Sequence, residues 1–527
     1  MVKRFHVTGN CVPGKHYMVD TSNKIEKIIT DYIQPGCYFT MNRARQYGKT
    51  TTLNLLEQRL KSDYIVLHLS FESADEYFKS SLNLVEGLIM DISDSLQQQN
   101  VSSEIIQEWN SPVSERFPMR TLGVRITNLC RECPKDIILM IDEVDKSSDN
   151  QIFLSFLALL REKYQKQLLE KDSTFKSVIL AGVYDIKNLK LKFHPDQESK
   201  NNSPWNVAVD FLIDMSFSAE DISTMLREYE EDYHTDMGID TMSNLLYGYT
   251  SGYPYLVSRI CQLIDERIAG SSVFPEKKDA WTKAGFLDAI RILLKESNTL
   301  FDDMIKHLYE YPKLGYMIKN ILFQGVRYTF EADSQIISLG IMFGFLKEKN
   351  NTVIIANRIF ETKLYNFFLS EEEGREQFQI VPDISGNQFI VHGMLQMDLV
   401  MKKFYEYFES ICGNSEDKFI EEEGRRIFLM FLRPIINGTG NYYIEAQTRD
   451  KTRTDIIVDY RGQQFIIELK LWKGQQYHHN GQIQLAEYLE FYHADRGYLL
   501  TFNFNKHKKT GISESVCNGK RILEVIV

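Results

Sequence analysis

The chain has 527 residues, of which 43% are hydrophobic and 25% charged, and its formal net charge is −11 at pH 7. This length exceeds a single hydrophobic core and predicts roughly two to four domains. The sequence has no run of roughly 18 or more apolar residues, which excludes a helix that spans a membrane. The acidic balance argues against a surface coated with non-specific nucleic-acid contacts, although it is compatible with a local basic groove.

Cysteine usage and the N-terminal segment bear on the compartment. The 7 cysteines are scattered along the chain, which is typical of free thiols in a reducing environment. The segment Met1–Gly9 contains basic residues but no apolar run after them, so it does not resemble a signal peptide. We therefore expect a cytoplasmic protein.

The first region, residues 1–270, alternates short apolar strands with helical stretches, which is the pattern of a parallel α/β sheet. Each expected strand is largely apolar, as in a sheet that is buried on both faces. The expected strands are Gly36–Met41, Tyr64–Phe71, Asp136–Asp142 and Ser177–Val183. Helices are expected between them, for example at Thr50–Leu60 and Leu82–Gln97.

The segment after the first expected strand carries most of a P-loop, whose full pattern is G-x-x-x-x-G-K-[ST]. Gly48, Lys49 and Thr50 match the second half, whereas Arg43 stands at the first glycine position. In such a loop, backbone N–H groups and a helix N-terminus hold phosphate, the lysine reaches the β- and γ-phosphates, and the hydroxyl binds Mg²⁺. We therefore expect ATP and Mg²⁺ as cofactors. The expected binding residues are Arg45, Gln46, Tyr47, Gly48, Lys49, Thr50 and Thr51, with Thr50 also a metal ligand.

A second motif follows further along the chain, where the apolar run Ile137–Ile141 ends in Asp142 and Glu143. This is typical of a Walker B strand, in which Asp142 holds Mg²⁺ and Glu143 polarises the attacking water. The alternative is a buried strand that ends in a solvated acidic turn, but the two motifs support each other. The altered P-loop leaves two possibilities open, a differently shaped loop that still binds nucleotide or a reduced turnover.

Four segments resemble the bacterial AAA-like ATPase family, which is related to the STAND-type and archaeal ATPases. They are Tyr17–Asp20, Arg43–Thr51, Ser203–Asp210 and Thr250–Val257. The resemblance covers about the first 270 residues and implies that Arg43 is a family substitution rather than a lost site. It also implies a helical lid, in which Gly252–Pro254 is similar to the G-x-P turn near the nucleotide; a plain helix start is the alternative. The strand ending Ala181–Val183 lacks the polar sensor residue typical of AAA+ proteins.

The next region, residues 275–370, changes to shorter helices followed by an amphipathic hairpin, which predicts a winged-helix-like domain. The expected pieces are Asp302–Leu308, Met317–Phe323, Ile336–Met342, Phe345–Lys347 and Thr352–Ala356. The acidic run Ser370–Glu376 is expected to be a solvated linker. It precedes a last unit at residues 385–527.

The last unit carries a group of charged residues around a hairpin signal at Arg461–Gly462. Glu468 and Lys470 share one face of an apolar strand, where charges are costly unless they pair or bind a metal. Asp455, on the preceding strand, can lie close to Glu468. We expect Asp455 and Glu468 to bind Mg²⁺ and Lys470 to orient the attacking water, which suits metal-dependent phosphodiester hydrolysis. An edge hairpin with one salt bridge is the alternative.

Flanking helices extend this pattern. The expected helix Lys418–Leu432 places Glu423 on its apolar stripe, and another helix opens at Gln482 after the charged strand. The order resembles the PD-(D/E)xK nuclease superfamily, in the form found fused behind AAA-like ATPases, over Glu416–Phe504. The resemblance implies a C-terminal α/β/α restriction-endonuclease-like fold, Glu423 as a further metal ligand, and Gln484 as the supporting glutamine, with Gln482 as its competitor.

Other polar features receive a structural interpretation. The pair His478–His479 is expected in a solvent-facing loop, and Cys130 and Cys133 lack the second pair that a zinc site needs. The basic clusters Lys506–Lys509 and Lys520–Arg521 are either solvated surface or part of a basic groove.

The whole sequence predicts ATP-dependent control of a Mg²⁺-dependent nuclease with DNA as its partner. The alternatives are a nucleotide-driven switch with a non-cutting nuclease fold and an ATPase without a nucleic-acid partner. The intact Asp455, Glu468 and Lys470 favour cutting, whereas the altered P-loop and the acidic charge favour a switch. AAA-like domains often assemble, and no residue decides whether this chain forms a homo-oligomer.

Overall fold

The computed structural model describes most of the chain: residues 3–146, 151–183, 205–324, 326, 328–375, 389–391, 394–412, 421–436, 440–443, 456–492, 494–505 and 510–527. These residues fall into two compact units, one mainly Val7–Phe217 and the other mainly Ser218–Ile341 with Phe345–Val527. Each is described by itself. Among the described residues, no helix has the length and apolar character needed to cross a bilayer.

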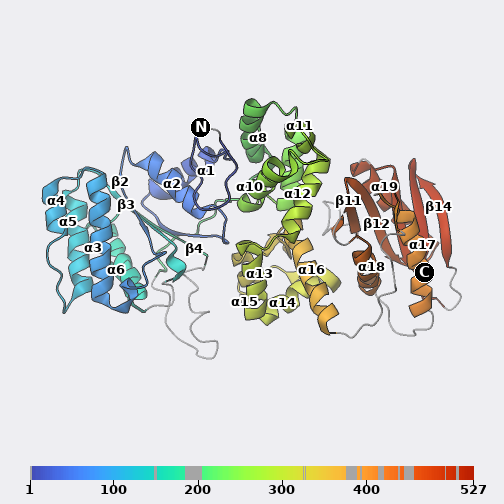
Figure 1. The fold of residues 1–527 in the computed structure, drawn as a ribbon. Helices are drawn as coiled ribbons and strands as arrows, with labels where there is room; N and C mark the ends of the chain where they lie inside the picture. The colour runs from blue at the N-terminus through green and yellow to red at the C-terminus, as the bar shows by residue number, and fades with distance from the viewer. Residues whose placement is uncertain are drawn as a thin grey trace. The chain divides into compact units, whose positions relative to one another are not determined.

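The first unit is built on a four-stranded parallel sheet with the strand order β1-β4-β3-β2 (Figure 1). Its strands are β1 (Tyr38–Asn42), β2 (Ile65–Ser70), β3 (Ile137–Asp142) and β4 (Ser177–Gly182). All side chains of β3 and β4 are buried. The prediction of a parallel sheet buried on both faces is therefore confirmed, and each strand begins and ends close to its expected bounds.

Helices cover both faces of this sheet because the apolar side chains of its strands alternate between two cores. Ile137, Leu139 and Ile141 pack into the core that includes α3, α5 and α6, which lie together in Figure 1. Ile138 and Met140 pack into the core that includes α1 and α2. The helices are α1 (Ser22–Ile28), α2 (Lys49–Leu60), α3 (Ser81–Gln98), α4 (Ser103–Trp109), α5 (Pro118–Glu132) and α6 (Gln151–Leu168).

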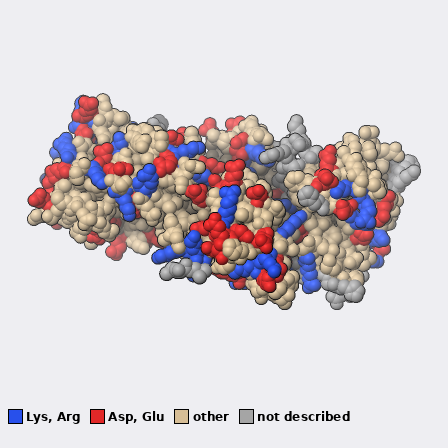
Figure 2. Space-filling view, turned by 90° about the horizontal axis from the view of Figure 1, so that it is seen from above, with Lys and Arg blue, Asp and Glu red and all other residues tan. Residues whose placement is uncertain are grey.

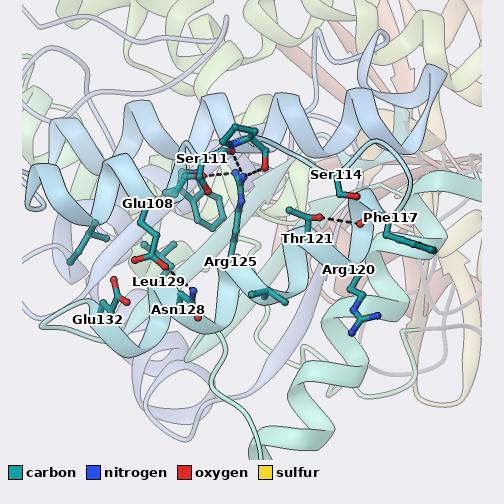
Figure 3. A pocket seen from close by; sticks show the side chains of 14 residues that line it. Glu108, Ser111, Ser114, Phe117, Arg120, Thr121, Arg125, Asn128, Leu129 and Glu132 are labelled. Atoms are coloured by element: carbon teal, nitrogen blue, oxygen red, sulfur yellow. Dashed lines mark hydrogen bonds between the residues drawn. The ribbon is translucent and has the colours of Figure 1, made fainter.

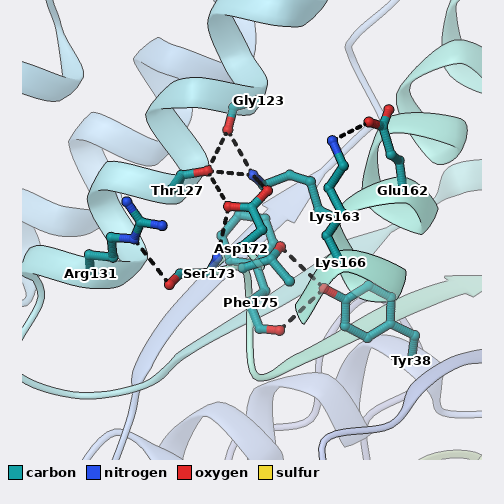
Figure 4. Close-up of polar contacts among 11 residues, drawn as sticks. Tyr38, Gly123, Thr127, Arg131, Glu162, Lys163, Lys166, Asp172, Ser173 and Phe175 are labelled. Atoms are coloured by element: carbon teal, nitrogen blue, oxygen red, sulfur yellow. Dashed lines mark hydrogen bonds and ion pairs between the residues drawn. The ribbon is translucent and has the colours of Figure 1, made fainter. Parts of the chain in front are cut away.

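A buried polar network joins α5, α6 and the segment before β4 (Figure 4). The ammonium of Lys163 donates to the backbone oxygen of Gly123 at 2.9 Å and to Thr127 Oγ1 at 2.7 Å. It also lies 2.9 Å from Asp172 Oδ2, and Thr127 donates to Asp172 Oδ1 at 2.6 Å. The side chains of Lys163 and Asp172 are only 4% and 14% exposed. Each charge therefore depends on the other.

The second unit begins with a group of helices, namely α8 (Ala219–Tyr233), α9 (Ile239–Thr250), α10 (Pro254–Leu263), α11 (Lys277–Ala280) and α12 (Lys283–Lys295). Of these, α8, α9 and α10 fall within residues 1–270, where the lid was expected. Ser218 caps α8, accepting a hydrogen bond from the N–H of Asp221, whose side chain accepts from the N–H of Ser218. Pro254 stands in the first turn of α10, as expected, where its missing N–H costs nothing.

Three short helices precede a hairpin of two strands, β6 and β7, which is the predicted winged-helix pattern, and β5, which lies between the second and third helices, completes an antiparallel sheet with the order β5-β7-β6. Positive φ angles at Asn350 and Asn351 turn the chain between β6 and β7. The elements are α13 (Thr299–Glu310), α14 (Pro312–Lys319), β5 (Tyr328–Thr329), α15 (Gln335–Met342), β6 (Leu346–Lys349), β7 (Thr352–Ile355) and α16 (Arg358–Arg375).

The C-terminal part contains a six-stranded mixed sheet with the order β10-β11-β12-β13-β15-β14. Leu485 and Leu489 of α19 pack on one face, against Leu499. Gly424 of α18 and Phe408 of α17 contact Phe502 on the other face. The expected α/β/α fold is therefore present. Its elements are α17 (Met397–Cys412), α18 (Glu421–Ile436), β10 (Gly440–Tyr443), β11 (Ile456–Tyr460), β12 (Gln463–Leu471), α19 (Gln475–Phe491), β13 (Arg496–Phe502), β14 (Gly511–Cys517) and β15 (Lys520–Ile526).

Candidate functional site

The P-loop connects the end of β1 to the start of α2. Gly48 caps α2 with φ +81°, and Gln46 also has a positive φ of 56°. A Cβ atom at Gly48 would meet nothing within 4 Å, so the space beside the turn is open. A side chain there would nevertheless strain the backbone, because L-residues rarely adopt this conformation. The loop therefore presents backbone and a helix N-terminus to open space, as phosphate binding requires.

Lys49 begins α2 and is only 8% exposed. Its ammonium donates to the backbone oxygens of Arg43 at 2.9 Å and Ala44 at 3.1 Å, which lie in the same loop. Burial lowers the pKa of Lys49, and nearby carboxylates oppose this shift. A buried ammonium that donates to loop carbonyls and lies near acids is well suited to exchange those carbonyls for phosphate oxygens.

The carboxylates near Lys49 belong to the last residue of β3, Asp142, and to Glu143 and Asp145 in the segment that follows it. β3 and β1 both pair with β4, and all three strands are parallel, so their carboxyl ends share one edge of the sheet. Glu143 has a φ of 55°, and its N–H donates to Asp142 Oδ1 at 2.8 Å. Such a conformation costs on the order of 1–3 kcal/mol in a residue other than glycine and occurs often at functional sites. Burial and Asp142 raise the pKa of Glu143, while Lys49 lowers it.

The remaining predicted loop residues differ in their surroundings. Thr50 and Thr51 lie in the first turn of α2, where Thr51 Oγ1 is 3.5 Å from the backbone nitrogen of Cys11. Burial, together with nearby Asp214, raises the pKa of Tyr47 to about 12. The side chain of Tyr47 lies near Asp214 and Ser216. Arg45 and Gln46 lie in the same turn.

This edge of the sheet fits ATP with Mg²⁺. Space lies open at Gly48, and the helix N-terminus and the Lys49 ammonium offer donors to phosphate. Asp142 and Thr50 offer oxygen ligands, which Mg²⁺ prefers. The first-turn threonine and the acidic residue at the strand end lie on the elements predicted to carry them.

Glu468 and Lys470 form the second candidate site, on β12. Lys470 Nζ lies 2.6 Å from Glu468 Oε1, and the side chains are 11% and 0% exposed. Glu468 is opposite Leu499 and Lys470 is opposite Thr501 on the face that α19 covers. A Cβ atom on Gly481 of α19 would lie 3.4 Å from Lys470 Cγ.

The alternative of an edge hairpin is only half right. The ion pair is present, but β12 lies between β11 and β13 in the interior of the sheet. A buried charged pair in an interior strand carries a desolvation cost that hydrophobic residues would avoid. Glu468 offers the hard oxygen ligands that Mg²⁺ takes.

The other predicted metal ligands of this site cannot be placed beside Glu468. Asp455 lies outside the described residues, just before Ile456, which pairs with Ile467. Glu423 belongs to α18, but its side chain is also outside the described part. In the residues that the structure describes, no group of three or more His, Cys, Asp or Glu could hold a metal ion. The metal roles of Asp455 and Glu423 remain predictions.

The sequence interpretation missed a polar cluster beside this pair. His478 was expected in a solvent-facing loop, but it lies in the first turn of α19 with a side chain only 11% exposed. Its Nε2 is 2.8 Å from Glu524 Oε2 and its Nδ1 is 3.3 Å from Thr501 Oγ1. Gln482 Nε2 donates to Glu524 Oε1 at 2.7 Å. The signal was the i,i+4 spacing of His478 and Gln482, which places both on one helix face.

Glu524 shows how strongly this cluster is held. Burial raises the pKa of Glu524, but hydrogen bonds from His478 and Gln482 outweigh it, so that the pKa lies below its ordinary value. Glu524 and Glu468 both flank Leu499 in the sheet and share its face. The face under α19 thus carries two buried carboxylates. Gln482, the competitor of the expected Gln484, contributes to it.

Basic side chains do not dominate the described surface seen in Figure 2, where they are interspersed with acidic ones. In the basic cluster Lys520–Arg521, the ammonium of Lys520 lies 3.0 Å from Glu490 and 3.7 Å from Asp495. This cluster is therefore partly neutralised. The other basic cluster, Lys506–Lys509, lies outside the described residues.

A separate cavity of about 430 Å³ lies between α4 and α5 (Figure 3). Arg125 shapes its wall by donating to the backbone oxygens of Trp109, Ser111 and Pro112. Asn128 Nδ2 also donates to Glu108 Oε1 at 2.8 Å. None of its lining residues belongs to the P-loop or to β3. The cavity is thus separate from the nucleotide-binding edge.

Comparisons with known proteins match two different families to the two parts of the chain that carry the candidate sites. Residues 13–368 match the model of the AAA-like domain family, and residues 441–514 match the PD-(D/E)XK nuclease superfamily. A comparison with curated proteins gave no match.

Solved structures that match part of this chain include a Walker-type ATPase of Pyrococcus abyssi, at 13% identity and a TM-score of 0.44, over 68% of this chain and 99% of that one. They also include ORC2 of Aeropyrum pernix, at 10% identity and a TM-score of 0.37, over 67% and 94% of the two chains. Cdc6p of Pyrobaculum aerophilum follows at 12% identity and a TM-score of 0.33, over 68% and 97%.

Proposed function

Because the chain belongs to the AAA-like domain family and carries a PD-(D/E)XK nuclease superfamily domain near its C-terminus, we propose that it binds and hydrolyses ATP to control Mg²⁺-dependent cleavage of DNA. The observation that carries the first half is the buried Lys49 ammonium beside Asp142 and Glu143 at one sheet edge. The second half rests on the buried pair Glu468–Lys470 on an interior strand.

ATP binding begins at the N-terminus of α2, whose N–H groups bind phosphate oxygens. Lys49 exchanges the carbonyls of Arg43 and Ala44 for the β- and γ-phosphates. Thr50 and Asp142 would hold Mg²⁺, which would neutralise charge on the phosphates when bound. Glu143 orients the attacking water and accepts its proton, a role that its raised pKa favours because a more basic carboxylate takes a proton more readily.

DNA cleavage uses the face of the C-terminal sheet under α19. Glu468, with Asp455 and Glu423, would hold a divalent cation, which activates water and stabilises the charge on the phosphate when it is bound. Lys470 leaves its partner Glu468 to orient the water and to balance the negative charge that develops on the phosphate. The cluster around Glu524 keeps α19 in place beside Lys470.

The test is cleavage of linear, circular and single-stranded DNA with Mg²⁺ or Mn²⁺, with and without ATP. Glu468→Ala should abolish cutting, and Lys49→Ala should change only its dependence on nucleotide. Glu487→Ala, an exposed glutamate of α19, is the matched control and should cut like the wild type. If the wild type and Glu468→Ala leave every substrate equally intact, the cleavage proposal fails.

A nucleotide-driven switch that binds nucleic acid without cutting is the second candidate. It is favoured by the 2.6 Å pair, because Lys470 already balances the charge of Glu468 without a metal. This candidate predicts DNA binding that weakens as salt rises, since cations are released from the phosphates. It also predicts that Glu468→Ala leaves this binding intact and that no metal produces cleavage.

A further inference from the structure

Arg43, at the first glycine position of the P-loop pattern, points away from the open turn. Its guanidinium donates to the backbone oxygens of Asn42 at 2.7 Å, Ile213 at 2.7 Å and Phe211 at 3.4 Å. It also lies 5.2 Å from the centre of the Phe211 ring. A glycine at this position would make none of these contacts. The P-loop arginine is thus bound to a segment far along the chain.

This distant segment, Phe211–Ser216, is held by further contacts from the same unit. The hydroxyl of Tyr32 donates to the backbone oxygen of Asp210 at 3.1 Å and accepts the N–H of Leu212 at 2.9 Å. The ammonium of Lys24 donates to the backbone oxygen of Ser216 at 2.5 Å. The segment forms no helix or strand and ends just before Ser218, the N-cap of α8. Its position therefore depends on side chains, and two of them, Arg43 and Tyr47, come from the P-loop turn.

Lys49 connects the same arginine to the phosphate site. Its ammonium donates to the backbone oxygen of Arg43 at 2.9 Å. A phosphate that takes this ammonium removes the hydrogen bond from the peptide group of Arg43. The main chain of Arg43 thus responds to nucleotide, while its side chain contacts the carbonyls of Phe211 and Ile213.

We propose that Arg43 is a positioning residue that couples occupancy of the phosphate site to the segment Phe211–Ser216, the connection into the helices that begin with α8. The proposal rests on the proposed ATP binding and adds a route by which bound nucleotide acts beyond its own site. Coupling is reciprocal, so whatever holds the segment also sets the nucleotide affinity by the same factor. On this proposal, Arg43 transmits the occupancy of the phosphate site and does not indicate that the P-loop has lost its function.

The experiment is amide hydrogen exchange of the full-length protein, alone and saturated with ADP or ATPγS, read over residues 211–217. In the wild type, nucleotide should change the exchange rates of this segment by about fivefold or more, the lower range of allosteric coupling. In Arg43→Gly, which restores the general P-loop pattern, this response should disappear. Arg59→Ala is the matched control, because it removes an exposed arginine paired with Glu26 and should respond like the wild type.

Arg43→Lys separates coupling from folding, because lysine keeps the charge but cannot bind both carbonyls as a guanidinium does. It should fold and show a reduced response, which keeps the test valid if Arg43→Gly unfolds. A full response to nucleotide in a folded Arg43→Gly or Arg43→Lys would overturn the proposal. If Arg43 were merely structural, its substitution would lower Tm but leave the response of hydrogen exchange to nucleotide intact. If the wild type binds neither ADP nor ATPγS in a fluorescence titration, the proposed function itself has failed.

Discussion

His478 Nε2 lies 2.8 Å from Glu524 Oε2 and so ties the first turn of α19 to β15. Both side chains are about nine-tenths buried or more. Three residues after His478, Gly481 packs on the side chain of Lys470. The pair therefore fixes the distance between α19 and β12, the strand that carries Glu468 and Lys470. Loss of this pair should be felt both in stability and at the candidate nuclease site.

Replacement of Glu524 by Gln should lower the free energy of unfolding by about 1–3 kcal/mol, because a buried partner of His478 loses a charged hydrogen bond. The effect should depend on pH. The pKa of Glu524 is below its ordinary value in the folded chain. The carboxylate therefore stabilises the fold above its unfolded pKa, and this contribution is lost as the pH falls through the folded pKa.

Urea denaturation of the wild type and Glu524→Gln from pH 7 to pH 3 measures this. The tryptophan Trp472, whose ring centre is 5.1 Å from that of His478, supplies a fluorescence signal near the pair. The two stability curves should converge in acid. A difference in the free energy of unfolding that stays constant from pH 7 to pH 3 would show that the charge of Glu524 does not stabilise the pair. Glu487→Gln, at an exposed position of α19, is the control and should match the wild type throughout.

Replacement of Lys49 by Met should weaken binding of ATP by about 10- to 100-fold, because one charge-assisted hydrogen bond contributes roughly 1.5–3 kcal/mol. Methionine fills the same buried space but has no charge. Titration with a fluorescent ATP analogue gives the Kd. Lys27→Met, at an exposed position of α1, controls for loss of a positive charge. Equal affinities in the wild type and Lys49→Met would remove the loop from the binding site.

Replacement of Glu143 by Gln should lower the rate of ATP hydrolysis by about 10²–10⁴-fold, the usual contribution of a general base. ATP should still bind, because Lys49 and the α2 N-terminus are intact. Since burial raises the pKa of Glu143, the acid limb of the wild-type pH–rate profile should lie above the pH expected for an ordinary glutamate. Release of phosphate measures both the rate of ATP hydrolysis and its dependence on pH. A Glu143→Gln variant that hydrolyses ATP at the wild-type rate would exclude Glu143 as the base.

The sheets were predictable because their signal is local. Each strand of the first sheet is a short apolar run, and burial on both faces requires that composition. Asp142 and Glu143 then follow from the position of the strand end. The hairpin at Arg461–Gly462 was also visible, since both residues adopt the positive φ that a two-residue turn needs.

The missed contacts are those between distant segments. Nothing in the sequence near Arg43 indicates that its guanidinium binds the carbonyls of Phe211 and Ile213, because backbone carbonyls carry no sequence signature. His478 was assigned to a loop because its polar neighbours hide the start of α19. The partner that buries it, Glu524, is a single acid in an apolar strand near the chain end. Such an acid is a useful signal, since burial without a partner is costly.

The proposal of DNA cleavage and the proposal of a non-cutting switch assign different roles to the pair Glu468–Lys470. If the pair is only structural, removing one charge should destabilise the fold by about 3–5 kcal/mol, and replacing both should recover most of that loss. Urea denaturation of Glu468→Gln, Lys470→Met and the double variant supplies the three values.

If the pair belongs to a metal site, Mn²⁺ should raise the Tm of the wild type, because a ligand that binds the folded state stabilises it. The same metal should leave Glu468→Gln unchanged, while Glu487→Gln should respond like the wild type. A Tm that does not respond to Mn²⁺ in any of these proteins, with full recovery in the double variant, would leave the ion pair as a structural feature and favour the switch.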